Sequence, residues 1–232
     1  MKTSMIKSIK YTALLLGIAT MPVLASAGTF KTITIDGDFS DWDGVPVFTT
    51  DITTLGTPPL GFTALSVAND DDFVYLRVQY DGSHLVNSGA NQIFITLDND
   101  NDANTGFNIF GLGVIGSEVG WQNDFPFDQR GGFNSGSIDN GGASIAPFFT
   151  TTTQQEIALS RNATFTTGGT VIFPNDTFGL GVYVNTDASN YELIAGTGSS
   201  AYTVAVPEPG HAGIFLAIGA IGIIAYRRRC RS

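Results

Sequence analysis

Short apolar runs recur along most of the chain, and each is bounded by Gly, Asn, Asp or Pro. Runs such as 30–35 and 73–80 alternate apolar and polar residues, which is the period of a half-buried β-strand. No stretch between 28 and 205 has the 3.6-residue apolar period of a long helix. We therefore predict an all-β fold, an antiparallel, jelly-roll-like β-sandwich. The expected strands are 30–35, 62–67, 73–80, 92–97, 109–115, 143–150, 155–159, 170–173, 178–184 and 191–194.

The charge of the chain is unevenly distributed. Residues 28–206 contain 20 of the 21 acidic residues but only 4 of the 11 basic residues. Such an excess of negative charge repels the phosphate backbone, so we expect no nucleic-acid partner. Cations and neutral polar partners such as sugars remain as ligands.

The first 27 residues have the three parts of a secretory signal peptide. A lysine-containing start is followed by an apolar run over 11–24 and by Ala25-Ser26-Ala27, a small-x-small site that predicts cleavage before Gly28. A first transmembrane helix is the alternative, but the apolar run is short for a membrane span. The sequence therefore predicts export through the inner membrane.

The last part of the chain combines three features in a fixed order. Pro207-Glu208-Pro209 precedes an uncharged segment over 212–226, and Arg227-Arg228-Arg229 follows it. As a transmembrane helix, this segment would span about 22 Å, less than a hydrocarbon core of about 30 Å. The basic cluster would remain cytoplasmic and the acidic body would lie outside. A marginal span with a basic stop suits a temporary anchor.

This order of features over residues 206–231 resembles the PEP-CTERM sorting signal of Gram-negative bacteria. The resemblance implies that an exosortase, a membrane-embedded processing enzyme, recognises and cleaves the tail near Pro207–Pro209. It also implies delivery to the cell surface or an extracellular polysaccharide matrix. The chain then divides into a signal peptide (1–27), a β-sandwich domain (28–205) and a sorting signal (206–231). The only cysteine is Cys230, so the body folds without disulfides.

A second resemblance covers roughly residues 30–195. Its opening motif is Ile35-Asp36-Gly37-Asp38-Phe39-Ser40-Asp41-Trp42, and further matching segments lie at 72–78, 95–100 with Thr105-Gly106, and 155–159. These segments are similar to the family 9 carbohydrate-binding module and to related DOMON-like sandwiches. The resemblance implies a jelly-roll-like sandwich that is frequently sugar-binding and frequently calcium-stabilised.

The loop Asp98-Asn99-Asp100-Asn101-Asp102-Ala103-Asn104 is a candidate calcium site. Oxygens of Asp98, Asp100, Asp102 and Asn104 can converge on one side of a tight turn, and Ca²⁺ takes six to eight oxygen ligands. The loop lacks the Gly and Glu that an EF-hand needs at its sixth and twelfth positions. A solvated Asx-rich turn is the alternative, because Asn and Asp favour turns.

A candidate sugar site lies in Trp121-Gln122-Asn123, before a glycine-rich segment over 131–142 that reads as a flexible loop. An aromatic ring can stack on the C–H face of a sugar, and amides can bind its hydroxyls. The alternative is that Trp121 packs into the core, as tryptophan commonly does. For Trp42 with its surrounding aspartates, we expect this core role.

Nothing in the sequence favours an enzyme. The body has one histidine, His84, no cysteine nucleophile and no G-x-S-x-G motif. Glu118, Glu156 and Glu192 are its only glutamates, and the latter two are expected to face outward from strands. The leading hypothesis is an exported, exosortase-processed protein that binds polysaccharide through a calcium-stabilised sandwich. A matrix or adhesion protein without a glycan site is the alternative, and a carboxylate-dependent glycan hydrolase comes third.

Overall fold

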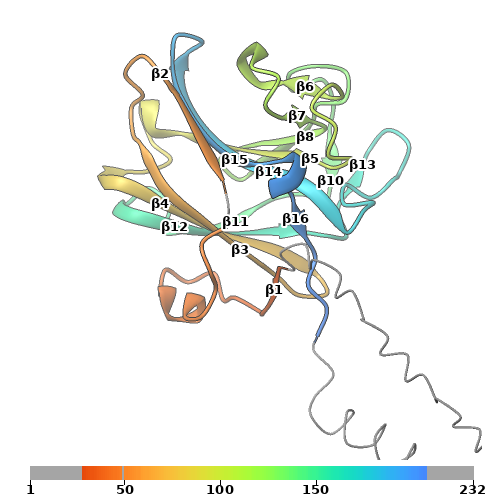
Figure 1. Cartoon of the computed structure of the whole chain (residues 1–232), viewed down its shortest axis with the longest axis horizontal. Helices are drawn as coiled ribbons and strands as arrows, with labels where there is room; N and C mark the ends of the chain where they lie inside the picture. Colours follow the sequence, from red (N-terminus) through yellow and green to blue (C-terminus); the bar gives the residue numbers. More distant parts are fainter. Residues whose placement is uncertain (1–27, 49, 208–232) are drawn as a thin grey trace, which may run out of the picture.

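The computed structural model describes residues 28–48 and 50–207, and it shows an all-β protein made of two packed sheets (Figure 1). The described residues contain sixteen strands, four short 3₁₀ turns and no α-helix. All strand pairs are antiparallel except the pair of β1 and β3. Among these residues no helix is long and apolar enough to cross a membrane.

One sheet has five strands in the order β1-β3-β4-β12-β11. Its members are β1 (Thr29–Phe30), β3 (Phe62–Asn69), β4 (Phe73–Leu85), β12 (Thr151–Ser160) and β11 (Ser144–Ala146). A hairpin turn joins β3 to β4, in which the Asp70 amide donates to the Phe73 carbonyl and the Asp70 carboxylate accepts the amides of Asp72 and Phe73.

The other sheet has the order β2-β15-β14-β5-β8-β9, with β16 also paired to β14. Its members are β2 (Asp51–Leu55), β15 (Asn190–Gly196), β14 (Thr177–Asp187), β5 (Ile93–Asp98), β8 (Val119–Gln122), β9 (Phe125–Asp128) and β16 (Tyr202–Thr203). Two small ladders join β6 (Phe107–Asn108) to β7 (Gly116–Ser117) and β10 (Ile138–Asp139) to β13 (Thr164–Phe165). The 3₁₀ turns are η1 (Phe39–Trp42), η2 (Gly89–Asn91), η3 (Ile109–Gly111) and η4 (Gly198–Ser200).

The main core lies between the two sheets. Alternate residues of β4 and β5, such as Leu76 and Ile95, point inward and have no exposed surface. Burying one such side chain contributes about 1.5–3 kcal/mol, so the alternation seen in the sequence accounts for the face-to-face packing. The inner rows belong to the strands expected at 62–67, 73–80, 92–97 and 178–184.

The predictions of strands at 30–35 and 109–115 are wrong, and both have the same cause. Residues 31–36 and 109–115 are apolar in part but mostly lie outside the ladders, and each covers the outer face of a sheet. Ile33 packs on the five-stranded sheet, whereas Ile109 and Ile115 pack on the seven-stranded sheet. Positive φ angles at Phe110, Gly111 and Gly113 prevent an extended strand there. Both outer faces therefore carry a small satellite core.

Further differences concern shorter elements. Residues 121–127, where no strand was expected, belong to the hairpin of β8 and β9, and β2 was not expected either. Of the expected strand over 143–150 only β11 forms a ladder, and 170–173 contributes only an isolated bridge between Val171 and Thr164.

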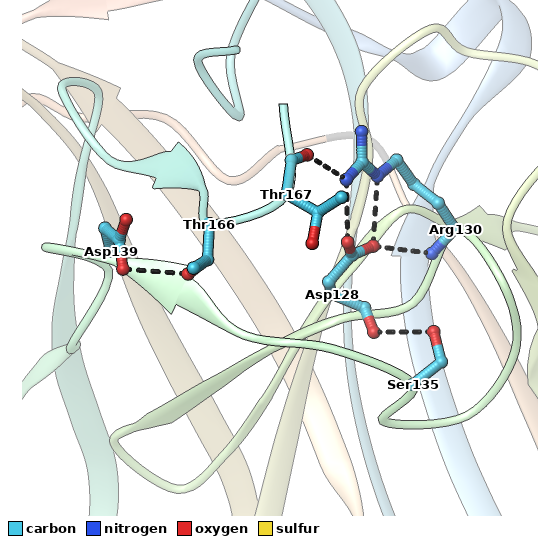
Figure 2. A network of polar contacts seen from close by, with 6 residues as sticks. All are labelled: Asp128, Arg130, Ser135, Asp139, Thr166 and Thr167. Carbon is cyan, nitrogen blue, oxygen red and sulfur yellow. Dashed lines mark hydrogen bonds and ion pairs between the residues drawn. The ribbon is translucent and has the colours of Figure 1, made fainter. Parts of the chain in front are cut away.

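The glycine-rich segment over 131–142 is held by a polar network (Figure 2). Arg130 donates from Nε and Nη2 to the Asp128 carboxylate at 3.0 and 2.7 Å, and from Nη2 to the Thr167 carbonyl at 3.0 Å. The Arg130 guanidinium also lies 3.7 Å from the ring centroid of Phe165. Ser135 Oγ donates to the Asp128 carbonyl, so the network joins this segment to the residues around β13.

The two ends of the described chain meet beside β3. The Gly28 amide donates to the Thr203 carbonyl at 2.8 Å. The buried Asn69 accepts hydrogen bonds from Tyr202 Oη and the Ala205 amide, both at 2.8 Å, and donates to the Ala205 carbonyl at 3.0 Å. The hydrogen-bonded body thus extends from Gly28 to Ala205.

Candidate functional site

An aromatic groove lies on the outer face of the seven-stranded sheet. It is covered in part by the connection between β5 and β8, which comprises residues 99–118. Its volume is about 260 Å³, and it is lined by Phe94, Phe107, Phe110, Phe133, Tyr183, Asn185 and Ala188. β5 and β14 supply its floor, because Phe94 and Tyr183 are register partners on the outward side. β6 and η3 supply one wall through Phe107 and Phe110.

The rings of the groove are arranged in stacked and edge-on pairs. Phe94 and Tyr183 stack with centroids 4.8 Å apart and planes 7° apart. Phe110 meets Tyr183 edge-on at 5.3 Å and stacks on Tyr191 at 4.1 Å. Phe133, 52% exposed, packs at 5.2 Å from Phe107. These contacts pack the rings against one another, and each aromatic pair contributes about 0.5–1.5 kcal/mol beyond burial.

Phe110 has an unfavourable backbone conformation. Its φ is +52°, in the left-handed region that costs a non-glycine residue about 1–2 kcal/mol. Five of the seven non-glycine residues with positive φ are asparagines, which tolerate this conformation, and the other two are Phe110 and Phe149. The fold therefore maintains a strained aromatic residue at the groove wall.

The polar side chains near the groove are neutral, namely amides and the Tyr183 phenol. Asn185 lines it, and Gln122 lies across the ladder from Phe94 and donates to Gln92 Oε1 at 3.0 Å. None of the four basic side chains of the described residues lines the groove. The groove therefore offers apolar ring faces and neutral hydrogen-bonding groups, without a cation to attract an anionic ligand.

Three carboxylates lie together where the two ends of the connection between β5 and β8 meet. Single oxygens of Asp98, Asp100 and Glu118 all lie within 4.8 Å of one another, and Asp98 and Glu118 are buried. Glu118 accepts hydrogen bonds from the Asn99 amide at 3.0 Å and from Thr105 Oγ1 at 2.8 Å. Burial, together with the charges of Glu118 and Asp100, raises the pKa of Asp98 to about 7. Burial likewise raises the pKa of Glu118, against the hydrogen bonds from Thr105 and Asn99.

The carboxylate cluster differs from the ligand set expected from the sequence. Asp98 and Asp100 belong to it, but the Asp102 carboxylate accepts the Asn104 amide at 3.0 Å and the Asn104 side chain at 2.7 Å. Glu118 was missed, because it lies outside the Asp/Asn run and approaches it only when β8 pairs with β5.

The proposed role of Trp121 in stacking on a sugar is wrong. Trp121 is 1% exposed, packs in the core between the sheets, and donates from Nε1 to the Gly141 carbonyl at 2.6 Å. Asn123 has a left-handed backbone and accepts a hydrogen bond from Asn87. Of these three residues, only Gln122 lies beside the aromatic groove.

The other glutamates are also buried, which was not expected: Glu156 faces outward from its strand but is covered by the opening segment, and Glu192 faces the other sheet. Glu156 accepts the amides of Asp36 and Gly37 at 2.8 and 2.6 Å. Glu192 accepts the Phe62 amide and Thr54 Oγ1, which links β15 to β3 and β2. These carboxylates are engaged in holding the fold. His84, the histidine of the body, contacts Asp81 at 2.7 Å near the surface.

Comparison with known proteins gives a weak structural likeness. No protein-family model matches the chain, and no curated protein matches it at a significant level. The fold is similar to that of a family 9 carbohydrate-binding module from Caldicellulosiruptor kristjanssonii in complex with glucose, with a TM-score of 0.43 and 13% identity over 79% of this chain and 97% of that chain. A structure of such a module from the same organism in complex with cellotriose has the same TM-score and identity, over 79% of this chain and 95% of that chain.

The residues of the expected terminal signals fall largely outside the described part. Pro207 ends that part, whereas Ala25, Ala27, Glu208, Pro209 and Arg227–Arg229 lie beyond it. The signal peptide, the membrane helix and the sorting tail remain predictions from the sequence.

Proposed function

We propose that this chain is an exported, non-catalytic protein that binds neutral polysaccharide through the aromatic groove. The observation that carries the proposal is the set of neighbouring rings of Phe94, Phe107, Phe110 and Phe133, with the Asn185 amide beside them. Aromatic faces receive the C–H faces of a pyranose, and a neutral amide can orient its hydroxyls. The site replaces the one expected around Trp121.

Charge limits the ligand class. The body carries twenty acidic residues and four basic ones, and the basic side chains are engaged elsewhere. Lys31 donates to the Asp43 carbonyl, Arg77 to Gln154, Arg130 to Asp128, and Arg161 to the Asp70 carbonyl. An anionic polymer such as polygalacturonate would meet repulsion over the whole body, whereas a neutral polymer would not.

Affinity electrophoresis tests the proposal. The purified full-length chain is run through gels that contain a neutral β-glucan, xylan or galactomannan, and through gels that contain polygalacturonate. We expect retardation by at least one neutral polymer and none by polygalacturonate. If no neutral polymer retards the chain, the second candidate, a matrix or adhesion protein without a glycan site, takes its place. The burial of Trp121 is the observation that favours this candidate.

We also propose that the carboxylate cluster binds Ca²⁺ as a structural ion. Two oxygens on opposite sides of a Ca²⁺ lie about 4.8 Å apart, so the spread of Asp98, Asp100 and Glu118 suits one ion, and carbonyls or water would complete the set. The ion would neutralise buried negative charge and hold together the two ends of the connection between β5 and β8. Thermal melts in calcium and in chelator test this, and saturation at 100 times Kd should stabilise by about 2.7 kcal/mol. The Glu118→Gln variant should lose this response, whereas the Asp139→Asn variant, changed at a distant exposed residue, should keep it.

Sorting is proposed from the sequence of the tail. An exosortase would process the chain after transient anchoring in the inner membrane of a Gram-negative bacterium and would release it to the cell surface or matrix. Replacement of Pro207, Glu208 and Pro209 by alanine should abolish processing, as seen by a change in mass and in the cell fraction. Unchanged processing would contradict the sorting proposal and leave the glycan proposal untouched.

A further inference from the structure

A second cleft lies on the outer face of the five-stranded sheet. It has a volume of about 270 Å³ and is lined by Ile33, Ile35, Phe73, Tyr75, Ser144 and Ala158. Its floor is one cross-strand row, in which Ser144 pairs with Ala158 and Ala158 pairs with Tyr75. The cleft exists because two small side chains follow a large ring along this row.

The N-terminal segment forms the opposite wall. Ile33 packs against Tyr75 and Ala158 in the satellite core, and Ile35 packs against the same cluster. This segment is held by Glu156, which accepts the Asp36 and Gly37 amides. The wall is therefore fixed by hydrogen bonds.

The lining combines an aromatic face with neutral polar groups. Phe73 is 38% exposed, with its centroid 6.0 Å from that of Tyr75. The Tyr75 hydroxyl donates to Asp70 Oδ2 at 2.7 Å, and burial together with this carboxylate raises the pKa of Tyr75, so the phenol stays neutral. Ser144 adds an exposed side chain on β11, the last strand of its sheet. No basic residue lines the cleft.

The two clefts face away from each other. Figure 1 shows β6 and β7 on one side of the sandwich and the N-terminal segment on the other. Phe107 of β6 lines the aromatic groove, whereas Ile33 and Ile35 of the N-terminal segment line the second cleft. The hydrophobic core and both sheets separate them. A single rigid segment of polymer cannot occupy both sites.

We propose that the second cleft binds a pyranose unit of a neutral polysaccharide, so that one molecule bridges two polymer segments. The proposal rests on the proposed glycan-binding function of the aromatic groove and extends it from binding to cross-linking. The cleft should favour a neutral sugar over an anionic one. It offers a ring face, neutral hydroxyls and a volume of about the size of a sugar, and the surrounding surface is negatively charged.

The experiment measures valence and cross-linking separately. Binding stoichiometry is determined by calorimetry with a hexasaccharide of the neutral polymer that retards the wild type most, and cross-linking by light scattering with that whole polymer. The variants of the full-length chain are Phe110→Ala for the groove, Phe73→Ala and Ser144→Leu for the second cleft, and Phe149→Ala as control. Ser144→Leu fills the cleft from an exposed position and keeps the core intact. Phe149 is 64% exposed and lines neither cleft.

We expect two sites per chain in the wild type and in Phe149→Ala, and one site in each cleft variant. The polymer-induced rise in scattering should disappear in every cleft variant, although each still binds the hexasaccharide. One site in the wild type that disappears with Phe110→Ala would overturn the second site and leave the proposed function standing. Absence of any binding by the wild type would overturn both.

Discussion

Trp42 donates from its indole Nε1 to Glu156 Oε2 at 3.1 Å, across 114 positions of sequence. The other Glu156 oxygen accepts two backbone amides, those of Asp36 and Gly37. A fully buried carboxylate on β12 thereby holds the Asp-rich opening segment against the outer face of the five-stranded sheet. Trp42 therefore has the core role expected from the sequence.

Replacement of Glu156 by glutamine should destabilise the protein by about 1.5–3 kcal/mol, because a charged acceptor of three hydrogen bonds is lost. Urea denaturation measures the change. Asp51→Asn, at an exposed position on the edge strand β2, should have almost no effect. Equal midpoints for Glu156→Gln and the wild type would contradict this role of Glu156.

The buried Trp121 should matter for stability and not for binding. Trp121→Phe removes the donor to the Gly141 carbonyl and part of the core volume, so we expect a loss of about 2–4 kcal/mol. Glycan affinity should stay within twofold of the wild type under conditions where the variant is folded. A tenfold loss of affinity in the fully folded variant would show that Trp121 contributes to glycan binding.

Two left-handed phenylalanines provide a matched pair for the aromatic groove. Phe110→Ala should weaken glycan binding at the groove by about 30-fold or more, since both a ring contact and the area that it buries are lost. Phe149→Ala has a similar backbone, with φ of +50° against +52°, but its ring lies outside the groove, so affinity should not change. Affinity electrophoresis of both variants checks the difference, and equal retardation would argue against the groove.

The Asp128–Arg130 pair should give a stability contribution that depends on pH. The hydrogen bond from Arg130 holds the pKa of Asp128 below its ordinary value of 3.8. A depressed pKa means that the folded state binds the proton less readily than the unfolded state does, so the stabilisation is present above about pH 4 and is lost as pH falls through the lower value. Asp128→Asn should therefore cost about 1 kcal/mol at pH 7. At pH 2.5 the difference from the wild type should be smaller. A pH-independent difference would show that the carboxylate charge is not the cause.

Asn69 should hold the C-terminal end of the described chain, around Tyr202 and Ala205, in place. Asn69→Ala leaves the Tyr202 hydroxyl and both backbone groups of Ala205 without their partner, which should cost about 2–4 kcal/mol. We expect limited proteolysis to cleave first between 200 and 207 in this variant. The Asn162→Ala variant, changed at an exposed residue, serves as control and should resist cleavage there like the wild type.

Local sequence patterns were enough to predict the class of fold and the inward-facing residues of its central strands. Alternating runs at 62–67, 73–80 and 92–97 bury one face each, and the Asp70–Asp72 turn joins two of them, because these are local properties of neighbouring residues. The same local pattern predicted strands at 30–35 and 109–115. There, alternation correctly indicated buried side chains, but burial alone does not say whether the backbone joins a ladder.

The aromatic groove and the carboxylate cluster depend on contacts between residues that are far apart in the sequence. Phe94, Phe110, Phe133 and Tyr183 come together through the pairing of β5 with β14 and through a loop that folds back over them, and no spacing in the chain encodes that approach. Glu118 joins Asp98 in the same way, and Trp121 is drawn into the core by the hairpin of β8 and β9. Strand register is set by contacts distant in sequence, so the polar and aromatic residues that it places side by side become a site only in the folded chain.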